Sequence, residues 1–280
     1  MLRGGLTAAG LVGPASLMVV VGLALPLALL MRYSLNRFVP GQFMVEALTL
    51  EDYAKFIADP YYTAILGTTL AMAAGVTLAS LALAYPVAMV LARAGGRLKA
   101  LLLLAIVLPL FVGNAVRAAG WMVAFGRGGV LSSLLEAVQL PPVTLMYTPA
   151  AVFVGILSVN LPFVVLTLSS VLEGIEESAS EAALSLGATP FAAWRLVTLP
   201  LSLPGLLAAG ILSFILTMNA YATPVLLGGP RFQMMAPVVA TEVLQQSNWP
   251  FGAAVSFVLM TVTLVLTAGA NILVARRTRS

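Results

Sequence analysis

Two residue types are missing from this sequence, and their absence excludes several kinds of site. The 280 residues contain no cysteine and no histidine. Disulfide frameworks, thiol nucleophiles, Ser-His-Asp triads and the zinc sites built from these side chains are therefore excluded. Any catalysis would have to use other groups, and no metal site is expected.

Charged residues are scarce as well. Asp, Glu, Lys and Arg make up 9% of the chain and hydrophobic residues 61%, whereas a soluble domain carries about a quarter charged residues. The mean hydropathy is +1.05. The apolar residues fall in long runs, and about 20 helical residues are needed to cross roughly 30 Å of hydrocarbon. The composition therefore predicts an integral membrane protein.

Six apolar runs predict six spanning helices in one all-α, polytopic domain over residues 1–280. The first run is longer than the apolar core of a signal peptide, which has about 7–15 residues. Pro109 interrupts the third helix. An outer loop at 32–62 is expected to hold a short surface helix after Thr49, and 126–148 is read as a loop. The predicted helices cover residues 11–31, 63–92, 100–125, 149–172, 203–227 and 251–274.

Positive charges predict the orientation of these helices. If both ends are cytoplasmic, the inner segments hold eight Lys and Arg residues and the outer segments five. Because Lys and Arg concentrate on the cytoplasmic side, both termini are predicted inside. The net charge of +4 fits residues that flank spanning helices, so no nucleic-acid partner is expected.

The inner loop at 173–200 carries signals for two short helices. Ser178 and Glu181 have the spacing of a capping box, and Gly187 is expected to end the first helix. Thr189-Pro190 predicts a second start, which Pro200 and Pro204 are expected to close. Such a loop, presenting small and apolar residues beside an acid, is either a docking surface or an amphipathic loop lying on the bilayer.

The same loop resembles the EAA loop of the permease subunits of ATP-driven (ABC) importers. Glu181-Ala182-Ala183, then Gly187, then Val197-Thr198-Leu199-Pro200 match that pattern over twenty positions, with Val197 in place of the commoner Ile. The resemblance implies a type I importer transmembrane fold and a loop that transmits nucleotide-driven closure to the helices. The residues expected to dock on the ATP-binding subunit are Glu181, Ala182, Ala183, Leu184, Gly187 and Pro200.

Other segments resemble the polyamine-type branch of that family. They are Leu50-Glu51-Asp52-Tyr53, Tyr85-Pro86, Leu108-Pro109 and Thr223-Pro224-Val225-Leu226-Leu227-Gly228-Gly229. The resemblance implies a polyamine such as spermidine or putrescine as cargo, or an opine or amino-acid-like relative. It also implies a bacterial inner-membrane location, a second homologous permease, two ATP-binding subunits and a soluble substrate-binding protein. No cofactor is expected on this chain, and ATP and Mg would bind the partner ATPase.

Polar residues at membrane depth are the candidates for a translocation pathway. A central Arg costs about 2.5–3.5 kcal/mol on insertion scales, so each such residue needs a reason. Arg117 either snorkels outward or faces the pathway or a subunit interface. Asn114 and Asn160 either line the pathway or bond to backbone freed by nearby prolines. Asn219, Tyr221 and Thr223 precede Pro224, and a helix broken there would expose polar groups to a cavity.

Two rival functions make predictions of their own. An ATP-independent secondary transporter or channel predicts buried ionisable groups, and only Arg117 qualifies, while Glu242 and the outer-loop acids are expected to attract cations only at the entrance. An intramembrane enzyme predicts paired carboxylates or an activated nucleophile, and neither is evident. The chain is not an ATPase, because neither Lys55 nor Lys99 lies in a phosphate-binding loop.

Overall fold

The computed structural model describes residues 3–141, 144–230 and 232–277. Its contacts divide the chain into two compact units. Unit 1 comprises Met1–Thr63 and Val238–Thr261, and unit 2 comprises Ala64–Pro237 and Val262–Ser280. Each unit is therefore built from two separate stretches of sequence. That the whole chain acts as one domain stays a prediction.

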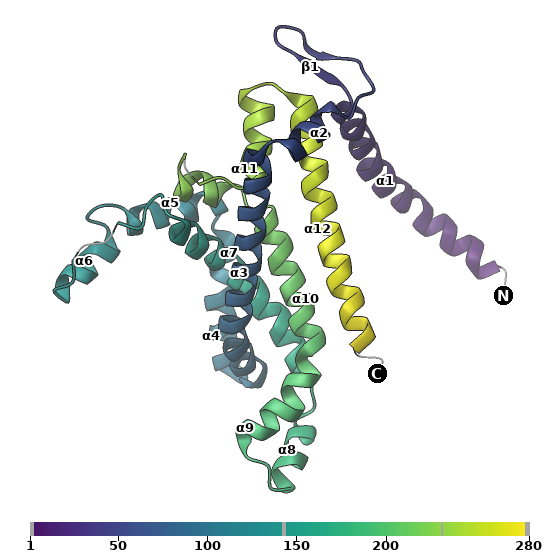
Figure 1. Ribbon diagram of the computed structural model, residues 1–280. Helices are drawn as coiled ribbons and strands as arrows, with labels where there is room; N and C mark the ends of the chain where they lie inside the picture. The colour runs from purple at the N-terminus through teal and green to yellow at the C-terminus, as the bar shows by residue number, and fades with distance from the viewer. Residues whose placement is uncertain (1–2, 142–143, 231, 278–280) are drawn as a thin grey trace. The chain divides into compact units, whose positions relative to one another are not determined.

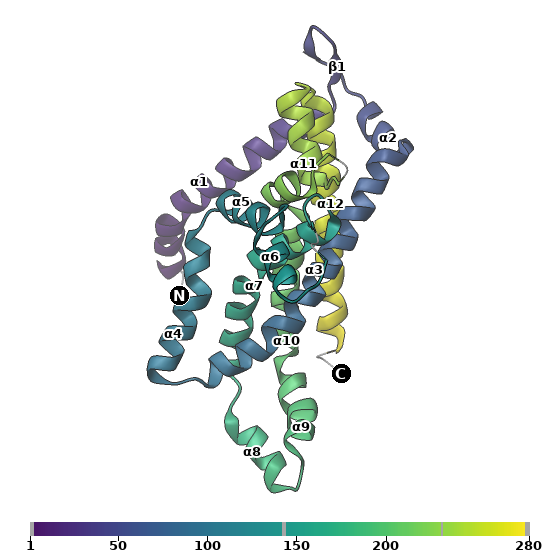
Figure 2. The same ribbon diagram turned by 90° about the vertical axis from the view of Figure 1, so that its left-hand side faces the viewer.

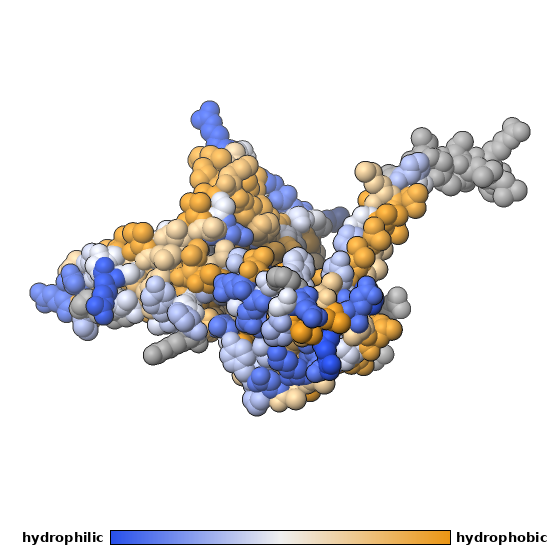
Figure 3. All heavy atoms as spheres, turned by 90° about the horizontal axis from the view of Figure 1, so that it is seen from above, coloured by the Kyte–Doolittle hydropathy of each residue, from blue (hydrophilic) through white to orange (hydrophobic). Residues whose placement is uncertain are grey.

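Unit 1 begins with a long helix followed by a hairpin and a short helix (Figure 1). Its first stretch contains α1 (Arg3–Ser34), β1 (Arg37–Val39), β2 (Phe43–Val45), α2 (Glu51–Ala58) and the first residues of α3 (Pro60–Arg93). The strands pair antiparallel, with Arg37 opposite Val45. None of the most apolar stretch of α1 is buried, and Figure 3 shows the hydrophobic residues along this helix. The predicted first helix is present and extends further at both ends.

The predicted short outer helix is confirmed as α2. Its N-cap is Leu50 rather than Thr49. The Thr49 hydroxyl still accepts a hydrogen bond from the Glu51 backbone N–H at 3.1 Å. Glu51 and Asp52 occupy the first turn, where carboxylates interact favourably with the helix dipole.

Unit 2 is organised around α3, α7 (Pro149–Glu173) and α10 (Leu199–Met218). Apolar residues of all three helices form one buried cluster. The Tyr85 hydroxyl of α3 lies 3.0 Å from the Ser202 hydroxyl of α10 within it. At Gly205 a Cβ atom would lie 2.8 Å from the Val171 side chain, so glycine is needed where α10 approaches α7. The predicted second and fourth helices are both present.

The predicted third helix is wrong in its course. Residues 96–137 form α4 (Gly96–Val107), η1 (Leu108–Phe111), α5 (Asn114–Phe125) and α6 (Val130–Ala137). The helices before and after Gly113 differ in direction by 96°, because Pro109 cannot continue an α-helix and the chain is extended at Val112 and Gly113. The expected loop at 126–148 contains α6. In the described part of the chain, five helices are long and apolar enough to span a membrane, or six if the bent pair counts as one.

The predicted fifth helix, 203–227, is wrong at both ends. The short helix α9 (Pro190–Ala193) continues through a π-turn, η2 (Trp194–Thr198), directly into α10. Pro200 and Pro204 therefore do not close the second loop helix. Pro200 lies just after the π-turn, whose wider winding accommodates a proline that lacks an N–H. The helix ends at Met218.

Three elements follow α10 that the apolar pattern did not separate. They are η3 (Pro224–Gly228), α11 (Met235–Ala240) and η4 (Thr241–Gln245), and they lead to α12 (Trp249–Arg277). The predicted sixth helix at 251–274 is present as α12. Two of the additional elements are π-turns, which often occur at functional sites.

Candidate docking hairpin and translocation cavity

The loop that resembles the EAA motif forms a helical hairpin at one end of unit 2. Helix α8 (Glu177–Ser185) and α9 lie beyond the ends of α7 and α10 (Figures 1 and 2). Between them the Gly187 N–H donates to the Leu184 carbonyl at 2.9 Å, and the Ala188 N–H to the Ala183 carbonyl at 3.1 Å. These two bonds form a Schellman motif. Gly187 has φ +89°, so the prediction that it ends the helix is confirmed.

The two predicted helix starts of this hairpin have different outcomes. Thr189 caps α9, since its hydroxyl accepts from the Ala192 N–H at 3.3 Å and Pro190 follows it. The capping box of Ser178 and Glu181 is wrong. The N-cap of α8 is Glu176, and the Ser178 hydroxyl donates to the Glu176 carboxylate at 3.1 Å. This leaves the Glu181 side chain unused by its own helix end and exposed.

Apolar side chains are exposed on the hairpin. Leu186 is 90% exposed, Phe191 66% and Leu196 71%, in a segment that also exposes Glu181. Of the other expected docking residues, Ala182, Leu184, Gly187 and Pro200 are exposed and Ala183 is half-buried. Exposed apolar residues around a charge are typical of a surface that another protein covers.

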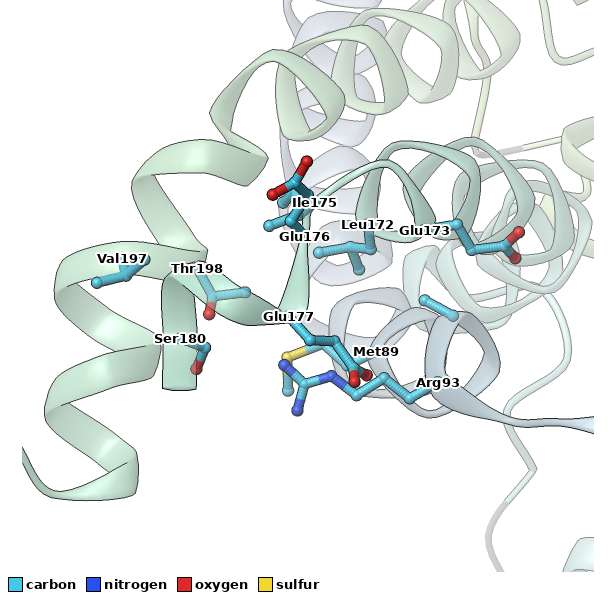
Figure 4. A pocket seen from close by; sticks show the side chains of 11 residues that line it. Met89, Arg93, Leu172, Glu173, Ile175, Glu176, Glu177, Ser180, Val197 and Thr198 are labelled. Atoms are coloured by element: carbon cyan, nitrogen blue, oxygen red, sulfur yellow. The ribbon is translucent and has the colours of Figure 1, made fainter. Parts of the chain in front are cut away.

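A cavity of about 300 Å³ lies where the hairpin joins the helix bundle. Met89 and Arg93 at the end of α3 line it together with Glu177 of α8, and in Figure 4 the side chains of Arg93 and Glu177 lie close to one another. Nearby, the Lys99 ammonium of α4 pairs with the Glu173 carboxylate at 3.0 Å. An ion pair thus connects the end of α7, where the hairpin begins, to α4.

A second cavity, of about 360 Å³, lies where α10 ends. Five of the six residues predicted for the pathway line it, namely Asn114, Asn160, Asn219, Tyr221 and Thr223. None of its lining residues is charged. The predicted helix break before Pro224 is confirmed, because α10 ends at Met218 and the chain resumes as η3.

Within this cavity Asn160 holds two helices together. Its side-chain amide is 1% exposed and donates to the Ser213 carbonyl at 3.1 Å and to the Thr217 hydroxyl at 2.8 Å. Asn219 and Tyr221 are exposed. Asn160 therefore stabilises the wall of the cavity, while Asn219 and Tyr221 are free to meet a solute.

Arg117 lies apart from the cavity lining. Its guanidinium donates to the carbonyls of Pro109 and Val112 at the break between η1 and α5, and the Pro109 carbonyl also accepts from the Val112 N–H at 3.2 Å. Asn114, for which the sequence left open a place in the pathway or such a bond to the backbone, lines the cavity. The structure thus assigns Arg117 to the bend of the chain.

Glu242 was expected to attract cations only at the entrance. The structure shows it 4% exposed in η4. The Tyr62 hydroxyl donates to its carboxylate at 3.2 Å. Both residues belong to unit 1. The described residues contain no cluster of three acids that could hold a metal ion.

The chain matches the family model of the binding-protein-dependent transport system inner membrane component over residues 80–279. The chain belongs to this family. It is therefore a multi-pass inner-membrane permease subunit of an ATP-driven importer, and membership implies a substrate-binding protein and ATPase partners.

Curated members of this permease family support the assignment. The chain is 31% identical over 242 residues to the spermidine/putrescine transport system permease protein PotB of Haemophilus influenzae, covering 85% of this chain and 84% of that one. It is 33% identical over 232 residues to the inner membrane ABC transporter permease protein YdcU of Escherichia coli, covering 78% and 73%.

A solved structure shows the same fold. A chain of the bacterial alginate ABC transporter, crystallised with its alginate-bound periplasmic protein, superposes with a TM-score of 0.77 at 17% identity, covering 99% of this chain and 96% of that one. The all-α polytopic fold predicted from the sequence is confirmed.

Proposed function

We propose that this permease moves a small cationic solute of the polyamine class, such as spermidine or putrescine, inward by alternating access. The name of the PotB relatives supports this cargo class. The cavity at the end of α10 supports it chemically, because it contains no cation among its lining residues. The C-terminal end of a helix also carries partial negative charge on its free carbonyls, which favours a protonated amine.

The permease would work as one half of a pair. A second homologous permease would complete the pathway, and two ATP-binding subunits, which carry the ATP and Mg, would drive it. A soluble substrate-binding protein would deliver the solute. The distribution of Lys and Arg supports a cytoplasmic position for both termini, and this orientation would put the α8–α9 hairpin on the side of the ATPase.

The observation that carries the ATPase-docking role is the geometry of that hairpin. A rigid Schellman turn at Gly187 holds Leu186 90% exposed beside the exposed Glu181. Burying a fully exposed leucine stabilises an interface by about 1.5–3 kcal/mol, and a carboxylate adds a partner for a basic side chain. Motion of the ATPase would then pass through α9 and η2 into α10, since they form one continuous helix.

Co-purification tests the docking role. The tagged permease is purified from its native host, and the ATPase subunit that accompanies it is quantified by mass spectrometry. Leu186→Glu or Glu181→Lys should abolish recovery of the ATPase and ATP-coupled uptake without reducing membrane insertion. Leu134→Glu, on the similarly exposed Leu134 of α6, is the matched control and should retain the ATPase. Normal recovery with Leu186→Glu would overturn the docking role.

The cargo is tested with the reconstituted complex. Spermidine or putrescine loaded on the binding protein should stimulate ATP hydrolysis and drive uptake into vesicles, whereas an anionic solute should not. Solute flux through the permease alone in ATP-free vesicles would contradict the proposal and point to a secondary transporter.

A further inference from the structure

A buried carboxylate in unit 1 has no role in docking or in the cavity of unit 2. Glu242 in the π-turn η4 is 4% exposed. Its Oε1 atom accepts from the Tyr62 hydroxyl at 3.2 Å and from the Gln246 side-chain amide at 3.4 Å. Burial raises the pKa of this carboxyl. A buried acid of this kind is costly unless a proton or a cation compensates its charge.

A second carboxylate, that of Asp52 in α2, interacts electrostatically with Glu242. Its Oδ2 atom is buried and has no hydrogen-bond partner in the described part of the chain. Neither Asp52 nor Glu242 makes an ion pair within 4.0 Å among the described residues. Two acids thus share one site without direct compensation, and one acceptor atom is left open.

The site already shows which chemical group it accepts. The Lys55 ammonium lies 4.3 Å from the centroid of the Phe251 ring, which is a cation–π contact. The Phe251 ring is fully buried and meets the Tyr62 ring edge-on at 4.8 Å. Lys55 also interacts electrostatically with both Asp52 and Glu242. A primary ammonium therefore lies over an aromatic face and interacts electrostatically with two carboxylates, without an ion pair within 4.0 Å among the described residues.

The charges of this arrangement do not balance. Asp52 and Glu242 carry two negative charges when ionised, and Lys55 supplies one positive charge from an exposed position on α2. The Lys55 side chain is exposed and makes no ion pair within 4.0 Å in the described residues, so its contact with the Phe251 ring is the interaction that a ligand would have to replace. Departure of the Lys55 side chain would leave an aromatic face and two acids, which is the environment that a protonated amine prefers.

We propose that Asp52, Glu242, Tyr62 and Phe251 form a binding site for a protonated primary amine, in which the Lys55 ammonium is an internal competitor that the ligand displaces. This ammonium seat is built from residues of unit 1, whereas the cavity at the end of α10 is lined by residues of unit 2. The role of this seat in transport rests on the proposed function. Its binding of an amine can be tested without transport.

Binding is measured on the full chain, purified with its partner subunits but without the soluble binding protein. Putrescine and methylammonium are titrated by calorimetry at neutral pH, with potassium ion as the comparison cation. Lys55→Met should tighten amine binding about 3- to 10-fold, because it removes the competitor. Asp52→Asn and Glu242→Gln should each weaken it about 10-fold or more, since each removes an acceptor charge.

Glu46→Gln, at an exposed acid of the same unit, is the matched control and should bind as the wild type does. Asp52 and Lys55 lie on the short surface helix α2, so their variants should fold even if Glu242→Gln does not. If Lys55→Met weakens binding or leaves it unchanged, the seat is an ordinary internal contact and the proposal is overturned. Equal binding of potassium ion would likewise overturn it.

The seat and the cargo class can fail independently. If putrescine binds with the expected response to Lys55→Met but does not drive ATP hydrolysis or uptake, the ammonium seat is confirmed and the polyamine cargo is contradicted. If putrescine is transported and Asp52→Asn binds it as the wild type does, the polyamine cargo is confirmed and the ammonium seat is contradicted.

Discussion

The side-chain amide of Asn160 in α7 donates a hydrogen bond of 2.8 Å to the hydroxyl of Thr217 in α10. The same amide reaches the carbonyl of Ser213 at 3.1 Å. In the turn between these partners the Thr217 hydroxyl donates to the Ser213 carbonyl at 2.9 Å. This buried network fixes two helices next to the point where α10 ends, so the cavity has a rigid wall beside a broken helix.

Asn160→Leu should destabilise the permease without altering its choice of solute. It keeps the branched shape of the side chain but removes the donor that links α7 to α10, and loss of buried hydrogen bonds costs about 1–2 kcal/mol. Thermal unfolding in detergent should therefore show a lower midpoint. Asn219→Ala is the control, since Asn219 is exposed, and it should affect uptake more than stability. The reverse ranking of the two variants would contradict the structural role of Asn160.

Gly187→Val should abolish ATP-coupled uptake while leaving insertion normal. A residue with a Cβ at positive φ costs about 1–2 kcal/mol, and Gly187 has φ +89°. A Cβ there would meet nothing within 4 Å, so any effect comes from the backbone and not from a clash. Gly187→Asn should retain most activity, because asparagine tolerates this region. Vesicle uptake and co-purified ATPase are the measurements, and equal loss in both variants would argue against the turn as the cause.

The docking hairpin could be predicted in detail because its signals are local. Gly187 ends a helix and Thr189 starts one through bonds that reach only a few residues along the chain. The capping box failed because Ser178 and Glu176 interact with each other, and the helix has its N-cap at Glu176, two residues before Ser178. Local spacing alone does not decide between two neighbouring starts.

The course of the third and fifth helices could not be predicted from apolar runs. Pro109 and Pro200 gave the same local signal, yet the chain bends by 96° after the first and continues through a π-turn at the second. Hydropathy is equally high in both cases and does not specify how a chain crosses or re-enters a membrane. The buried position of Glu242 depends on Tyr62, 180 residues away in sequence, and no local pattern reports such a pairing.

Gly155→Ala should disturb the cavity wall through contact with η3. A Cβ at Gly155 would lie 2.5 Å from the Thr223 Cγ2 atom and 2.6 Å from the Leu227 Cδ1 atom, and overpacking of this kind costs about 1–3 kcal/mol. Thr223→Ser removes one of the two contacts, so the double variant should recover part of the loss. Denaturant unfolding of the single and double variants in detergent measures the coupling. Strict additivity would show that the two positions do not touch.

The ammonium seat should make stability depend on pH. Burial raises the pKa of the Glu242 carboxyl above its ordinary value of 4.5, against the opposing effects of the Tyr62 hydrogen bond and the Lys55 ammonium. Burial also raises the pKa of Asp52, with Glu51 and Glu242 adding to the shift and Lys55 opposing it. The native protein therefore holds these protons more tightly than the unfolded chain does.

The free energy of unfolding should accordingly fall as the pH rises from about 4.5 through the raised pKa values, because ionisation is then costlier in the native state. Glu242→Gln keeps an oxygen that can accept from the Tyr62 hydroxyl but cannot ionise, so it should flatten this dependence and raise the unfolding midpoint at neutral pH. The midpoint is measured by thermal unfolding in detergent between pH 4 and 8, with Glu46→Gln as the exposed control. A slope in Glu242→Gln as steep as in the wild type would show that the pKa of Glu242 is the same in the native and unfolded states, and would contradict this prediction.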